Sequence, residues 1–209
     1  DLPLDEAVRL RVQMAGGTAT SAYMNCSGKH AAMLLTCVIN DWSTADYTAM
    51  DHPLQQAILA ETATHAGEEP WATAVDGCGA PLFGLTVVGL ARLGASLTQS
   101  GDPASQRVAS AMRAHPEWVA GTQRDAAALQ RSLPGSLIKE GAEAVYLVVL
   151  PDGRSIALKI EDGSGRARPI AMAGILRALG IDNEVIASQS RQVLLGGGQP
   201  AGEIVASVG

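Results

Sequence analysis

The sequence predicts a mixed α/β fold, of the α+β kind, in which helices come first and an antiparallel sheet follows. The clearest evidence for the sheet is a pair of apolar segments rich in β-branched residues, 144–150 and 155–160, separated by the turn Pro151-Asp152-Gly153-Arg154. Two such segments joined by a short turn with glycine are typical of a hairpin. Apolar periodicity bounded by Gly and Pro predicts helices over about 5–14, 31–39, 51–65, 85–97, 103–115, within 117–132, and over 170–179. Candidate final strands lie at 192–195 and 203–206.

The length of 209 residues allows one sizeable domain or two small ones. Hydrophobic residues make up 47% and charged residues 17% of the 209 residues, which supplies a packed core. The net charge of −6 and the lack of a basic run argue against a nucleic-acid partner. No apolar stretch is long enough to span a bilayer and the first residues do not resemble a signal peptide, so we expect no membrane partner. Three cysteines are too few for a disulfide framework, which favours a cytoplasmic location.

Two short motifs in the first half of the chain combine cysteine, glycine and charged residues. They read Asn25-Cys26-Ser27-Gly28-Lys29-His30 and Asp76-Gly77-Cys78-Gly79-Ala80-Pro81. Cys26 comes just before the segment 31–39, which is apolar on nearly every side and predicts a buried helix. A helix N-terminus and the nearby Lys29 both favour a thiolate at Cys26. Two glycines and Pro81 predict that residues 75–81 are irregular, and the glycines on both sides of Cys78 let the backbone approach a ligand or metal closely.

Two thiolates on separate loops could bind one zinc ion and leave its other positions to nitrogen, oxygen or water. From side-chain chemistry alone, His30 is the preferred third ligand, because a lysine amine must first lose its proton. The spacing matches no standard zinc signature, and Cys26 could instead be a small buried residue in a tight turn. Cys37 lies inside the apolar segment and is expected to belong to the core.

A third motif, Leu137-Ile138-Lys139-Glu140-Gly141-Ala142-Glu143, precedes the predicted hairpin. Its Lys-x-Gly pattern resembles the strand of serine β-lactamase-like acyl-transfer enzymes, where the lysine lines the active site and the glycine leaves room for substrate. The alternative is a solvated lysine before a strand. Ser136 and Lys139 also form a Ser-x-x-Lys pattern, but they enter a strand instead of opening a helix, so we interpret this match as chance.

Together these motifs resemble the Rhizobium etli-type L-asparaginases, the asparaginase II or class 3 group. The same ordered set includes His52-Pro53, Pro116-Glu117 and Val119-Ala120-Gly121, and the likeness extends from about Gly16 to Val205. The resemblance implies a single domain over residues 1–209 with a serine β-lactamase and glutaminase-like fold. It also implies hydrolysis of L-asparagine to L-aspartate and ammonia.

The resemblance further implies a Zn²⁺ site made by Cys26, Lys29 and Cys78, in which Lys29 replaces His30 as the third ligand. Water or substrate would fill the fourth position. Asp76 and His30 are then the expected substrate-binding residues, with Asp76 orienting the site or the substrate amine.

For the hydrolysis itself, the resemblance implies serine–lysine pairs. A further lysine of the family corresponds to Lys139, with Lys159 as the competing position. We expect a homodimer, because two-fold dimers are the commonest closed assembly.

The chain departs from the family pattern in one respect. The family's serine nucleophile and its partner lysine lie in an N-terminal Ser-x-x-Lys segment, which has no match here, so we expect very low activity from these residues alone. Two other functions are therefore kept open. One is a non-catalytic zinc-containing binding or structural protein, and the other is a related amidohydrolase such as a glutaminase.

Overall fold

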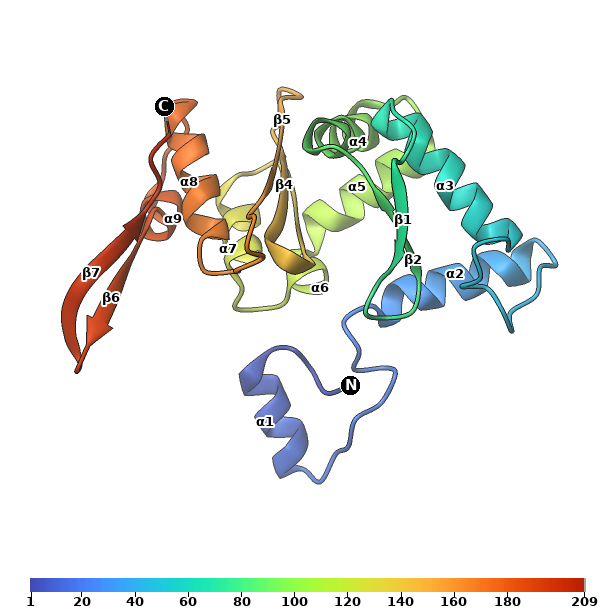
Figure 1. Ribbon diagram of the computed structural model, residues 1–209, viewed down its shortest axis with the longest axis horizontal. Helices are drawn as coiled ribbons and strands as arrows, with labels where there is room; N and C mark the ends of the chain where they lie inside the picture. The colour runs from blue at the N-terminus through green and yellow to red at the C-terminus, as the bar shows by residue number, and fades with distance from the viewer. Residues whose placement is uncertain (209) are drawn as a thin grey trace. The chain divides into compact units, whose positions relative to one another are not determined.

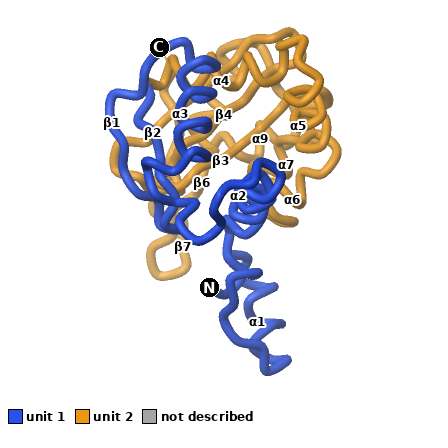
Figure 2. Tube along the Cα trace, turned by 90° about the vertical axis from the view of Figure 1, so that its right-hand side faces the viewer, with its two compact units in different colours: residues 1–85 blue, residues 86–209 orange. Residues whose placement is uncertain are grey.

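The computed structural model describes residues 1–208 (Figure 1). The chain divides into two compact units, residues 1–85 and 86–209 (Figure 2). Helices and small antiparallel sheets confirm the mixed α/β character, while a single domain over residues 1–209 stays a prediction. No helix of the described part of the chain is long and apolar enough to cross a membrane.

The first unit has three helices and one hairpin. These are α1 (Glu6–Met14), α2 (Ser27–Ile39), α3 (Pro53–Ala66), β1 (Ala72–Val75) and β2 (Pro81–Gly84). Asp5 caps α1, and the side chain of His52 caps α3 by accepting a hydrogen bond from the backbone N–H of Leu54 at 3.1 Å. Pro53 at the first position of α3 suits the helix start, because it has no N–H to satisfy.

The core of the first unit lies between α2, α3 and the hairpin. Its buried members are Met33, Cys37, Leu54 and Ala80, against which Trp42, Tyr47, Ile58 and Cys78 pack. Cys37 is fully buried, which confirms the prediction that it is a core residue.

The prediction that the helix over 31–39 is buried on all sides is wrong. Only Met33 and Cys37 of α2 are buried, and they lie one turn apart on one face of the helix. Leu35, Val38 and Ile39 are exposed, with Ile39 70% accessible. The reason is that the other elements of this unit pack against a single face of α2.

The hairpin of the first unit was not predicted from the sequence. We expected residues 75–81 to be irregular, and residues 76–80 do form a turn, but β1 and β2 flank it in antiparallel register from Ala72↔Gly84 to Val75↔Pro81. Pro81 is tolerated because it is the first residue of its strand. In Figure 1 this turn lies beside the N-terminal end of α2.

The second unit is built on a three-stranded antiparallel sheet with the order β3-β4-β5. Its strands are β3 (Leu137–Gly141), β4 (Val145–Val149) and β5 (Ser155–Lys159), with a short 3₁₀ turn, η1 (Ala142–Ala144), between the first two. Its helices are α4 (Val87–Gln99), α5 (Pro103–Ala114), α6 (Pro116–Ala120), α7 (Asp125–Ser132), α8 (Arg168–Ala178) and α9 (Glu184–Gln189). The predicted hairpin over 144–160 is therefore confirmed as β4 and β5. A last hairpin, β6 (Arg191–Gly196) and β7 (Gln199–Val205), confirms the candidate final strands.

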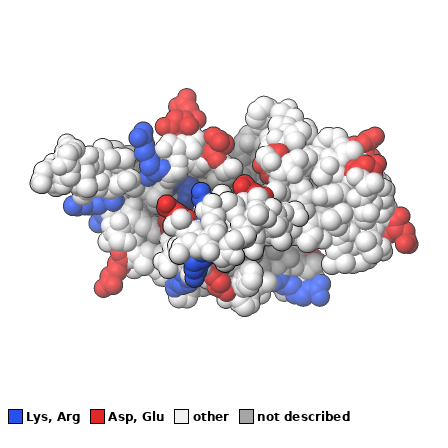
Figure 3. Space-filling view, turned by 90° about the horizontal axis from the view of Figure 1, so that it is seen from below, with Lys and Arg blue, Asp and Glu red and all other residues white. Residues whose placement is uncertain are grey.

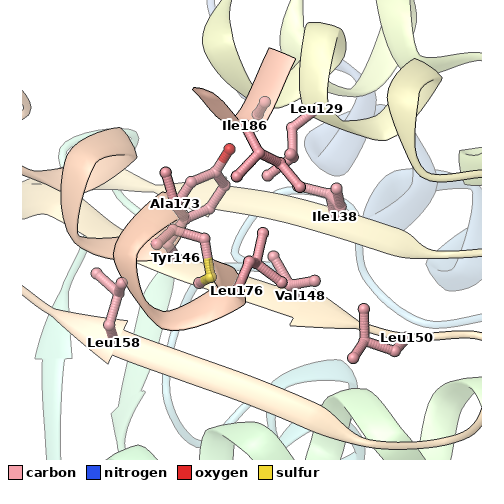
Figure 4. Close-up of a cluster of buried hydrophobic side chains, with 11 residues drawn as sticks. Leu129, Ile138, Tyr146, Val148, Leu150, Leu158, Ala173, Leu176 and Ile186 are labelled. Carbon is pink, nitrogen blue, oxygen red and sulfur yellow. The ribbon is translucent and has the colours of Figure 1, made fainter. Parts of the chain in front are cut away.

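Alternation along β4 gives the central sheet two buried faces. Tyr146, Val148 and Leu150 belong to one cluster with residues of α7, α8 and α9, including Leu176 and Ile186 (Figure 4). Leu147 and Val149 point to the other face and pack in a second cluster with Ala109 and Met112 of α5 and Leu97 of α4. Helices thus cover both faces of the sheet.

A set of charged side chains, of which Glu140 and Arg168 are buried, holds β3 against the neighbouring helices. The carboxylate of Glu140 pairs with Arg124, at 2.6 Å from its Nε, and with Arg168, which also pairs with Asp125 at 2.7 Å. Glu140 and Arg168 are both about one-twelfth exposed, and buried charges of this kind need partners on every side. The side-chain amide of Gln130 also bonds the backbone of Ser136 and Ile138 at the start of the strand.

Charged residues are mixed on the surface. On the face drawn in Figure 3, Lys and Arg side chains lie in small groups interspersed with Asp and Glu side chains. This distribution accompanies a net charge of −6.

The close packing of α4 against the sheet at Gly94 provides a stability test. A Cβ on Gly94 of α4 would lie 2.8 Å from Leu147 and 3.0 Å from Val149, so Gly94→Ala should force α4 away from the sheet. Overpacking of this kind lowers the free energy of unfolding by about 1–3 kcal/mol. Urea denaturation should show this loss, while Gly101→Ala, where a Cβ meets nothing within 4 Å, should change stability little. Equal effects of the two substitutions would contradict the packing described.

Candidate functional site

Two elements of the first unit bring the cysteine motifs together. Cys26 is the N-cap residue of α2, and the backbone N–H of His30 donates to its carbonyl at 3.0 Å. Cys78 lies in the turn between β1 and β2. Lys29 and Asp76 are held by the same two elements, so the contact between the motifs is made by a helix start and a hairpin turn.

The turn that carries Cys78 is closed by backbone hydrogen bonds. The N–H of Asp76 donates to the carbonyl of Ala80, and the N–H of Gly79 donates to the carbonyl of Asp76, both at 2.8 Å. The carboxylate of Asp76 also accepts from the N–H of Gly77 at 2.9 Å. Gly79 has a φ of +86°, a conformation that glycine adopts without strain. The glycines beside Cys78 therefore allow the turn to form and also leave the thiol accessible.

Four side chains form what we call the thiol cluster: Cys26, Lys29, Asp76 and Cys78. Within it, the ligand atoms of Cys26, Asp76 and Cys78 all lie within 4.8 Å of one another. The Cys78 thiol donates to Asp76 Oδ2 at 3.2 Å, and the Lys29 ammonium donates to the same oxygen at 3.1 Å. All four side chains are partly exposed, so small solutes can reach the cluster.

Three groups of the thiol cluster have shifted pKa values. The pKa of Asp76 is lowered, because its carboxylate accepts hydrogen bonds from the Cys78 thiol and from Lys29. Partial burial acts to lower the pKa of Lys29, but the hydrogen bonds to Asp76 and Cys78 and the neighbouring thiolates outweigh it and raise the pKa overall. Burial raises the pKa of the Cys26 thiol. Lys29 opposes this shift, as the sequence predicted, but does not overcome it.

The donor set fits a zinc ion. Two sulfur atoms and a carboxylate oxygen are among the donors from which zinc sites are built, and Lys29 adds a nitrogen donor once it has lost its proton. Among residues 1–208, Cys26, Asp76 and Cys78 are the one group of three His, Cys, Asp or Glu residues with ligand atoms this close. Asp76, expected only to bind or orient substrate, thus stands as near to the thiols as a ligand would.

His30 lies outside that group and has a different partner. Its Nδ1 is 2.6 Å from the hydroxyl of Tyr47, and the two rings meet edge to face with centroids 5.7 Å apart. Its Nε2 is buried and has no hydrogen-bond partner among the described residues. A role in substrate binding stays a prediction for His30. Tyr47 was missed because it lies in no motif, and only the fold places it beside His30.

Lys139 and Lys159 both lie in the second unit, on β3 and β5. Lys139 is opposite Leu147 and Lys159 is opposite Val145, so the two lysines lie on the same face of the sheet. Both side chains are exposed, and each ammonium donates to the carbonyl of the next residue. The choice of Lys139 over Lys159 stays a prediction. Ser136 is buried just before β3, which confirms that this Ser-x-x-Lys pattern enters a strand.

Comparison with known proteins identifies the family. The family model of L-asparaginase II matches residues 1–206. The chain belongs to the L-asparaginase II family. A search of curated proteins found no match. The expectation of an asparaginase is confirmed at the level of the family, while the Rhizobium etli type stays a prediction.

The lowered pKa of Asp76 gives the L-asparaginase II chain a testable pH dependence. Ionised Asp76 stabilises the folded chain above about pH 4, and this stabilisation is lost as the pH falls through the lowered folded pKa. We expect Asp76→Asn to reduce the free energy of unfolding at about pH 6 but much less at about pH 2.5. Urea denaturation with a chelator present would measure both. Asp51→Asn, at an exposed site of the same unit, serves as the control. An Asp76→Asn effect that is the same at both pH values would contradict the assignment.

Proposed function

We propose that the protein hydrolyses the side-chain amide of L-asparagine to give L-aspartate and ammonia, and that the thiol cluster binds zinc. Membership of the L-asparaginase II family over residues 1–206 supports the reaction. The observation that carries the zinc site is the convergence of Cys26 and Cys78, within 4.8 Å of each other and of Asp76, from separate elements. Hydrophobic packing alone gives no reason for two thiols, a carboxylate and an ammonium to meet at a partly exposed position.

In this proposal Cys26, Cys78 and Lys29 hold the metal. When bound, zinc would supply positive charge that polarises a carbonyl or orients substrate. Asp76 accepts the hydrogen bond of the Lys29 ammonium at 3.1 Å, and this amine must release its proton to solvent before it binds a metal. Asp76 is the competing third ligand, because a carboxylate needs no such loss at neutral pH.

Hydrolysis in this proposal uses a serine nucleophile activated by lysine. The proposed lysine is Lys139 on β3, next to Glu140 and its ion pairs with Arg124 and Arg168, and Lys159 on the same sheet face is the alternative. A positive charge at the edge of the sheet stabilises the negative charge that develops as the amide is attacked.

The wider assignments follow from the same family. We propose a serine β-lactamase and glutaminase-like fold, which the antiparallel sheet with helices on both faces supports. We also propose a cytoplasmic homodimer, and light scattering of the purified protein would measure its mass in solution.

The zinc proposal is tested by elemental analysis of the purified protein. About one zinc per chain is expected, and Cys78→Ala should abolish it because a sulfur ligand is lost. Cys37→Ala changes a fully buried cysteine outside the thiol cluster and should keep the metal. If Cys37→Ala loses zinc and Cys78→Ala keeps it, the site is wrong. Comparing the zinc affinities of Lys29→Met and Asp76→Asn identifies the third ligand. Loss of a residue that lies beside the metal without binding it weakens the affinity by only about 10–100-fold, whereas loss of a ligand weakens it more.

The reaction is tested by ammonia release from L-asparagine and L-glutamine in a preparation that includes a Ser-x-x-Lys segment, because very low activity is expected from these residues alone. We expect kcat/KM for asparagine to exceed that for glutamine by about 10–200-fold, since the two differ by one methylene. Lys139→Met should lower kcat by about 10²–10⁴-fold if this lysine takes part in proton transfer, with Lys159→Met as the matched control. A preference for glutamine would favour a glutaminase. Zinc binding without ammonia release from either amide would favour a non-catalytic zinc-containing protein.

A further inference from the structure

The two sulfur atoms of the thiol cluster are close enough to react with each other. Cys26 Sγ and Cys78 Sγ lie within 4.8 Å, and both residues are partly exposed. The third cysteine, Cys37, is fully buried in the core between α2 and α3. Of the three thiols, those of Cys26 and Cys78 are therefore the two that a dissolved oxidant can reach.

The local backbone can accommodate a bond between these sulfurs. A disulfide needs an S–S distance of about 2.05 Å, so the two atoms must approach by less than about 3 Å. Cys78 lies in a hairpin turn between Gly77 and Gly79, and a Cβ on either glycine would meet nothing within 4 Å. The turn is uncrowded at both glycines, which leaves space for the shift of the turn and rotation of the Cys78 side chain that the bond requires.

We propose that Cys26 and Cys78 are a site of reversible oxidative modification, at which a peroxide joins them in a disulfide. One thiolate attacks a peroxide oxygen, the O–O bond breaks, and the hydroxide that leaves takes a proton to become water. The sulfenic acid that forms is attacked by the second thiolate. The S–S bond forms as the S–O bond breaks, and a second water leaves. In total two thiols and one hydrogen peroxide give one disulfide and two waters.

The disulfide changes what the thiol cluster can bind. It removes both sulfur ligands at once and the hydrogen bond from Cys78 to Asp76, while the pair between Lys29 and Asp76 can persist. The oxidised cluster therefore cannot hold zinc through sulfur. This consequence rests on the zinc site of the proposed function, but the formation of the disulfide does not.

The test treats the purified protein with hydrogen peroxide and follows two readouts. Intact mass should fall by about 2 Da per chain, and peptide mapping without reductant should recover a Cys26–Cys78 linked peptide. Zinc release, followed with a colorimetric chelator, should rise in step with that peptide, and dithiothreitol should reverse both. Cys37→Ala should behave like the parent protein, whereas Cys78→Ala should form no intramolecular link.

The outcomes separate this inference from the proposed function. A linked peptide from a protein that holds no zinc even in its reduced form supports the inference and contradicts the zinc site. Three other products overturn the inference: sulfinic acid at Cys26 or Cys78, a disulfide between two chains, or a disulfide to Cys37. If the reduced protein binds zinc in these cases, the zinc site is still supported. A linked peptide that dithiothreitol does not open also overturns the inference, because the modification would not be reversible.

Discussion

The carboxylate of Asp76 is the group on which the arrangement of the thiol cluster depends. One of its oxygens accepts from Lys29, which lies on α2, and from Cys78, which lies in the hairpin turn. The other oxygen accepts from the N–H of Gly77 and fixes the carboxylate within the turn. A helix start and a turn far apart in the sequence are thereby held in contact by one ionised side chain.

A similar principle operates in the second unit, where Glu140 is held between two guanidinium groups. Arg124 precedes α7 and Arg168 begins α8, so the pairs connect β3 to the helices that cover one face of the sheet. Arg168 also lies over the ring of Tyr146, 5.2 Å from its centroid. Because neighbouring residues of a strand point to opposite faces, the burial of Glu140 directs Lys139 to the opposite side of the sheet.

The local sequence pattern was sufficient to predict elements whose defining residues are neighbours along the chain. The alternation and turn of 144–160 predicted β4 and β5, and the Gly-Cys-Gly sequence predicted an irregular turn at Cys78. It was not sufficient for β1 and β2, whose strands have four residues each and are stabilised by pairing with each other. Nor could the apolar segment 31–39 show which of its sides would be covered, because that depends on how many partners α2 meets.

By itself the sequence determined the residue types of the site, their order along the chain and the family to which they belong. Only the tertiary structure decided that Asp76 lies among the thiols and that His30 turns to Tyr47 instead. It also decided that burial outweighs Lys29 in setting the pKa of Cys26. The physical reason is that hydrogen bonds and desolvation depend on distances between elements, which residue spacing along the chain does not fix.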